Sequence, residues 1–119
     1  MIRTLLLCAI LAVGLMTPDA AQAHAVLVES TPIVKSKVPG DKIEINLHYN
    51  SRIDAKRSRL VLKGAGGETV LTVRQGKTEA DIAATAEGLK PGAYTLLWDV
   101  LSVDGHVSRG KIPFTAVER

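Results

Sequence analysis

The sequence has very little sulfur and few aromatic side chains. It contains one cysteine, two methionines, one tryptophan, two tyrosines and one phenylalanine. Cys8, Met1 and Met16 all lie within the first 23 residues, so the rest of the chain has no sulfur-containing side chain. This excludes disulfide bonds beyond residue 23, and a small domain of this kind must rely on its apolar core alone. It also excludes thiolate and thioether ligands, which soft metal ions prefer.

The charge is modest, with a formal net charge of +3. The basic residues are scattered along the chain from Lys35 to Lys111 and form no stripe in the sequence. With so few aromatic side chains to stack on bases, this composition argues against a nucleic-acid partner.

The first 23 residues resemble a secretory signal peptide. Its parts are the basic Arg3, the apolar run 5–16 (LLLCAILAVGLM), and the small residues Ala21 and Ala23. An apolar run of this length is too short to span a bilayer, which takes about 20 helical residues. We therefore expect an export signal that is removed, and a periplasmic protein that is not membrane-spanning once cleaved.

The small residues place the expected cleavage between Ala23 and His24. Ala23 and Ala25 form a second Ala-x-Ala pair, and cleavage after that pair would leave Val26 first. The first site lies at the more usual distance from the apolar run. The mature chain is then one domain, residues 24–119.

Beyond the signal, the pattern is one of short strands separated by turns. In 42–50 (KIEINLHYN) apolar and polar residues alternate with the period of two that is typical of a half-buried strand. Further strands are predicted at 58–63, 69–74, 80–85, 94–103 and 111–117. Segments 58–63 and 69–74 flank a glycine-rich connection that suits a hairpin, and Pro113 predicts an edge strand or a bulge in 111–117. About six or seven strands at this spacing predict an all-β fold, a Greek-key sandwich or small barrel.

Three residues from the two ends of the mature chain form a candidate metal site. A terminal His24 offers its α-amine and its imidazole, which together can close a chelate ring on a metal ion. Asp104 and His106, two apart in SVDGHVS (102–108), would project to one face of an extended segment, with Gly105 leaving space between them. Two imidazoles, an amine and a carboxylate suit the tetragonal preference of Cu(II).

Asp-Gly is also a strong hairpin signal, so the aspartate and histidine could simply belong to a turn. A metal-free interaction module is therefore one alternative. An oxidative copper enzyme is another, because lytic polysaccharide monooxygenases also hold copper through an N-terminal histidine.

The motifs HAVLVESTP (24–32) and LWDVLSVDGHVSRGKIPF (97–114), in this order and in a chain of this length, resemble the CopC family of periplasmic copper-binding proteins. The resemblance implies an Ig-like Greek-key β-sandwich or barrel of about seven strands that binds Cu(II) through His24, Asp104 and His106. Some members also bind Cu(I) through a methionine-rich loop. This chain lacks those methionines and resembles the Cu(II)-only type.

The chain departs from the family pattern after the strand at 42–50. Many relatives carry Ser-Glu where this chain has Asn50 and Ser51, which could at most hydrogen-bond a bound water. His48 is expected to be a solvated surface residue, or otherwise a supporting or additional ligand. Trp98, Tyr49 and Phe114 are expected in or near the core, and Arg109 is expected to be solvated.

The resemblance implies a non-enzymatic copper carrier or buffer that acts in copper homeostasis, resistance or uptake. Its expected partners are an inner-membrane importer of the CopD type or a periplasmic copper oxidase.

Overall fold

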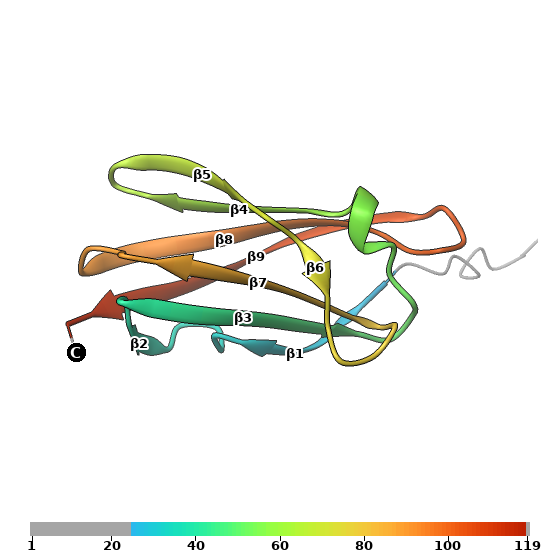
Figure 1. Ribbon diagram of the computed structural model, residues 1–119, viewed down its shortest axis with the longest axis horizontal. Coiled ribbons are helices and arrows are strands. Elements are labelled where there is room, and N and C mark those ends of the chain that lie inside the picture. Colours follow the sequence, from blue (N-terminus) through green and yellow to red (C-terminus); the bar gives the residue numbers. More distant parts are fainter. Residues whose placement is uncertain (1–24, 119) are drawn as a thin grey trace, which may run out of the picture.

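The computed structural model describes residues 25–118, which form two β-sheets packed face to face (Figure 1). The described elements are β1 (Leu27–Thr31), β2 (Lys37–Pro39), β3 (Lys42–Tyr49), the 3-10 turn η3 (Ala55–Arg57), β4 (Arg59–Gly64), β5 (Gly67–Leu71), β6 (Arg74–Gln75), β7 (Asp81–Glu87), β8 (Gly92–Leu101) and β9 (Val107–Val117). The expected signal peptide and His24 lie outside the described residues. Within residues 25–118, no helix is long and apolar enough to cross a membrane.

One sheet has four strands in the order β1-β3-β7-β6, and the other has five in the order β2-β9-β8-β4-β5. Neighbouring strands are antiparallel except for the β2–β9 pair, which is parallel. The all-β sandwich predicted from the sequence is confirmed. The described residues contain more strands than expected because the short β2 and β6 give no periodic signal of their own.

The core lies between the sheets and is formed by one side of each strand. In β3 the predicted alternation is confirmed, with Ile43, Ile45, Leu47 and Tyr49 buried. Trp98 and Phe114 are also buried, as predicted.

Two expectations about the strands are wrong. The segment 69–74 is not one strand: β5 ends at Leu71, and β6 pairs with β7 in the other sheet, so the chain crosses between sheets here. β9 is not an edge strand, because it lies between β2 and β8. Pro113 is accommodated because its nitrogen, which has no hydrogen to donate, faces β2 rather than β8. The pairing of β2 with β9 begins beyond Pro113, with Lys37 opposite Thr115. No β8 hydrogen bond is therefore lost at Pro113.

Candidate metal centre

The turn between β8 and β9 carries Asp104 and His106 at one end of the sandwich. The Ser102 amide donates to the His106 carbonyl (2.9 Å), and the Gly105 amide donates to the Ser102 carbonyl (2.9 Å). Gly105 has a φ of +98°, which residues with a Cβ rarely adopt. The segment is therefore a tight turn rather than the extended chain expected from the spacing. The turn still brings the two side chains together.

Asp104 is the hydrogen-bond centre of this turn. Its Oδ1 accepts from the Ser102 hydroxyl (2.5 Å), from His106 Nδ1 (3.1 Å) and from the His106 amide (3.2 Å). These bonds, led by the one from Ser102, lower the pKa of Asp104 to about 2. The carboxylate is thus ionised at neutral pH. Because all three bonds reach Oδ1, a cation at Oδ2 would not break them.

The first described residues of the chain are held next to this turn. The Ala25 amide donates to the Ser108 hydroxyl (3.1 Å), two residues after His106. The Val26 amide donates to Asn50 Oδ1 (2.8 Å), and the Asn50 amide donates to the Val26 carbonyl (3.0 Å). Asn50 therefore holds the N-terminal segment, rather than at most a bound water as the sequence suggested.

His24 itself lies outside the described residues, so the structure does not test its assignment as a ligand. The next residue in the sequence, Ala25, is buried, with 4% of its surface exposed, and its amide is bonded to Ser108 on β9. Ala25 is thus held beside the Asp104–His106 turn.

Aromatic packing supports the strands that lead into the turn. Trp98 on β8 lies over Gly110 on β9, where an added Cβ would come within 2.3 Å of the indole ring. Tyr49 packs edge to face against Trp98, with ring centroids 5.3 Å apart. Tyr49 directly precedes Asn50, so the same cluster supports β8, β9 and the residue that holds the N-terminal segment.

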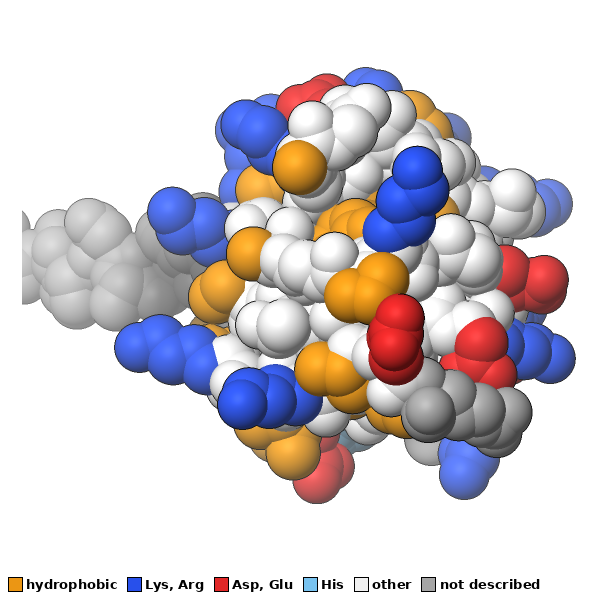
Figure 2. Space-filling model, turned by 90° about the vertical axis from the view of Figure 1, so that its left-hand side faces the viewer, with side chains coloured by type: hydrophobic (Ala, Val, Ile, Leu, Met, Phe, Trp, Pro, Cys, Tyr) orange, Lys and Arg blue, Asp and Glu red, His pale blue; other side chains and the backbone are white. Residues whose placement is uncertain are grey.

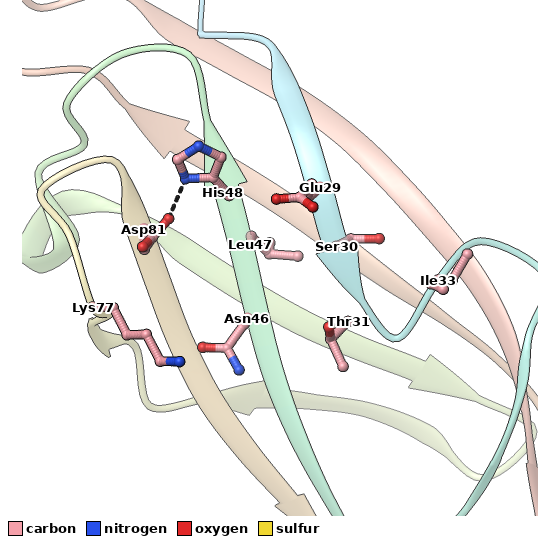
Figure 3. Close-up of a pocket in the computed structure, with 9 residues that line it drawn as sticks. All are labelled: Glu29, Ser30, Thr31, Ile33, Asn46, Leu47, His48, Lys77 and Asp81. Carbon is pink, nitrogen blue, oxygen red and sulfur yellow. Dashed lines mark hydrogen bonds and ion pairs between the residues drawn. The ribbon is translucent and has the colours of Figure 1, made fainter.

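His48 lies elsewhere, on the outer face of the four-stranded sheet. Its Nδ1 is bonded to the carboxylate of Asp81 on β7, and both residues line a hollow of about 470 Å³ (Figure 3). Asp81 also accepts from the amide (3.0 Å) and hydroxyl (2.9 Å) of Thr78. Burial raises the pKa of Asp81, but the bonds from His48 and Thr78 outweigh it, and the net pKa is lowered. His48 is 41% exposed, so it is only partly solvated, and its partner was not predicted.

Within residues 25–118, no three His, Cys, Asp or Glu side chains are gathered so that they could hold a metal ion. The described part of the candidate centre is a pair, Asp104 and His106.

The sequence reasoning missed Ser102, Ser108 and Asp81, and it gave Asn50 a different role. Ser102 and Ser108 flank the Asp-Gly-His motif and continue its spacing of two residues. This spacing could have identified them as neighbours of Asp104 and His106. The partners Asn50–Val26 and His48–Asp81 are far apart in sequence, and no local pattern points to them.

Comparison with known proteins gives one family. Residues 27–117 match the CopC domain model, which is most of the chain. The protein YobA of Escherichia coli K12 is 33% identical over 111 residues, which cover 90% of this chain and 89% of YobA. The copper transport protein CutJ of Bacillus subtilis is 22% identical over 82% of this chain, but the match covers only 19% of CutJ.

Solved structures agree in fold. CopC from Methylosinus trichosporium OB3b superimposes with a TM-score of 0.71 at 24% identity, covering 81% of this chain and 96% of that one. PcoC, a methionine-rich copper resistance protein from Escherichia coli, gives a TM-score of 0.63 at 24% identity, covering 80% of this chain and all of PcoC. From the family model and the identity to YobA, we conclude that this chain belongs to the CopC family.

Proposed function

We propose that this protein is a periplasmic Cu(II) carrier or buffer that acts in copper homeostasis, resistance or uptake. Membership of the CopC family supports a role in copper handling, as do the similarities to the copper transport protein CutJ and the copper resistance protein PcoC. The single observation that carries the proposal is the bond from the Ala25 amide to Ser108, because it holds the residue after His24 in the sequence beside Asp104 and His106.

The proposed ligands are the amine and imidazole of His24, the imidazole of His106 and the carboxylate of Asp104. Three nitrogens and one oxygen suit tetragonal Cu(II). The ionised Asp104 contributes a negative charge without a deprotonation cost at neutral pH. After residue 23 the chain has no methionine or cysteine, so it lacks the soft ligands that would favour Cu(I).

The geometry favours carriage of copper by ligand exchange over catalysis. The Asp104 and His106 side chains are 48% and 47% exposed, so an acceptor can approach them directly. Three of the four aromatic residues, Tyr49, Trp98 and Phe114, are buried. The described surface therefore offers no aromatic platform of the kind that polysaccharide-oxidising copper enzymes present to their substrate.

We propose a CopD-like inner-membrane importer or a periplasmic copper oxidase as the acceptor. CutJ supports the first, because a CopC-like segment makes up about a fifth of that larger copper transport protein.

The test is a one-residue extension of the exported protein. Intact mass first establishes that the chain begins at His24, and Cu(II) affinity is then measured by competition with a chelator of known affinity. A glycine added before His24 removes the amine from the chelate ring, and we expect at least about a 100-fold loss of affinity. A glycine added after Arg119 is the matched control. Equal affinities for the two extended proteins, or a mature chain that begins at Val26, would refute the proposed ligand set.

A further inference from the structure

The two outer faces of the sandwich carry opposite charge. The register places an excess of cations on the five-stranded sheet, namely Lys37, Arg59, Lys63, Arg109 and Lys111 against Glu68 and Asp99. On the four-stranded sheet it places an excess of carboxylates, namely Glu29, Glu44, Asp81 and Glu87 against Lys42 and Arg74. The basic residues that are scattered in the sequence are thus gathered by the fold.

The cationic face has an apolar strip across its middle. Val70, Val61 and Leu97 lie side by side on β5, β4 and β8, and Lys111 on β9 continues the row. Val70 is 58% exposed, so the strip is open to solvent at its β5 end. Seen from the end of the sandwich, lysine and arginine side chains line the left-hand edge, with hydrophobic side chains between them (Figure 2).

Charged rows border this strip on both sides. The row Arg59–Asp99–Arg109 lies on one side, and Lys63 lies on the other with Glu68 opposite it on β5. Arg109 donates to Asp99 (2.9 Å), so part of the charge of that row is balanced internally. A hollow of about 380 Å³ is lined by both arginines, by Val61 and Leu97, and by the carboxylates Glu68 and Asp99. Across the whole outer face the five cations still outnumber these two carboxylates.

From this arrangement we propose that the outer face of the five-stranded sheet docks the protein onto an anionic phospholipid surface. Aliphatic side chains can contact the headgroup boundary while the long stems of Lys and Arg carry their charges to the phosphates. The opposite face carries more carboxylates than cations, so the same surface attracts it less and the cationic face is the favoured side for binding. The proposal does not depend on copper binding.

The composition of the face favours lipid over an acidic protein. Three of its five cations are lysines, a residue type that is depleted in protein–protein interfaces. A lysine ammonium is a compact charge on a flexible stem, which suits a fluid array of headgroups more than a fixed carboxylate.

The experiment measures co-sedimentation of metal-free protein with vesicles at low salt. Phosphatidylcholine vesicles are compared with vesicles that contain about one third phosphatidylglycerol. We expect binding only to the anionic vesicles, and weaker binding at about 0.15 M salt. The double variant Lys63→Gln/Lys111→Gln should bind about tenfold more weakly, because each cation near the surface contributes to the attraction.

The matched control is Lys42→Gln/Lys77→Gln, which removes the same charge from exposed positions on or beside the opposite face. It should bind within about twofold of the parent protein, apart from the small effect of net charge. Circular dichroism shows that each variant is folded. The proposal is overturned if the parent does not bind anionic vesicles, if both double variants lose binding equally, or if only a soluble polyglutamate chain is bound. Competition by inorganic phosphate alone would also overturn it, because that would indicate a free anion site.

Discussion

Residues 25–118 contain two histidine–aspartate pairs that make the same contact, Nδ1 to a carboxylate oxygen, in different settings. His106 and Asp104 lie two residues apart in a tight turn at the end of the sandwich, and both side chains are about half exposed. His48 and Asp81 lie on neighbouring strands, and Asp81 is only 15% exposed.

The difference shows that the pair alone does not make a metal site. The turn pair lies beside Ala25 and Val26, which Ser108 and Asn50 hold in place. In the proposed mature chain, the amine and imidazole of His24 would complete the donor set there. The sheet pair has Glu29 and Asn46 as its neighbours around the hollow, and it offers one nitrogen donor (Figure 3). We infer that its role is structural.

The largest expected difference between the pairs is in copper affinity. His106→Ala removes a nitrogen donor and should weaken Cu(II) binding by at least about 100-fold, since even the loss of a supporting residue costs 10–100-fold. His48→Ala is the matched control and should change affinity by less than about threefold. Both are measured by chelator competition, and EPR reports the number of coupled nitrogens.

A His48→Ala protein with copper affinity as weak as that of His106→Ala would place the metal at the sheet pair. That result would invalidate the comparison. An unchanged EPR spectrum in His106→Ala would equally exclude His106 as a ligand, whatever the fate of His48.

The next largest effect concerns the residue that holds the N-terminal segment. Asn50→Ala removes the acceptor for the Val26 amide and should weaken Cu(II) binding about tenfold, because the chain start becomes less well positioned. Asn46→Ala, at an exposed position on the same strand, is the control and should have no effect. An effect on affinity of Asn46→Ala as large as that of Asn50→Ala would show that β3 as a whole, rather than this contact, is responsible.

Much of the fold was predictable, because alternation of apolar and polar residues reports burial directly. The strand at 42–50 was predicted from this pattern, and so was the burial of Trp98. The splitting of 69–74 between two sheets was not predictable, since both halves carry the same β-forming residues. The crossing is determined by which sheet each half pairs with, and pairing is a property of the whole fold.

The candidate site also has a part that could be predicted from the sequence and a part that could not. Asp104 and His106 could be selected from local spacing, even though the turn conformation set by Gly105 differs from the extended one expected. The contact between Ala25 and Ser108 joins residues 83 positions apart, so spacing within a motif could not reveal it. The ligand chemistry of His24, Asp104 and His106 suggested that the two ends could meet, and the family resemblance implied it, but neither identified this contact.

The smallest expected effect is on stability, at the sheet pair. Asp81→Asn weakens the bonds from His48 and Thr78 and should lower the free energy of unfolding of the metal-free protein by about 1–2 kcal/mol near neutral pH. Copper affinity should be unchanged. Chemical denaturation, followed by the fluorescence of Trp98, measures the difference.

This difference should depend on pH in a defined direction. The pKa of Asp81 in the folded protein lies below its ordinary value of 3.8, so the stabilisation by its carboxylate is fully present above that pH. It is lost as the pH falls further and the folded carboxyl takes up its proton. The free energies of unfolding of the parent and Asp81→Asn should therefore converge as the pH falls below about 4.

Asp99→Asn, at a carboxylate paired with the exposed Arg109, is the control and should lower the free energy of unfolding by less than about 1 kcal/mol. A constant difference between the parent and Asp81→Asn across this range would mean that the ionised carboxylate does not stabilise the sheet, and the pair would then lose the structural role assigned to it.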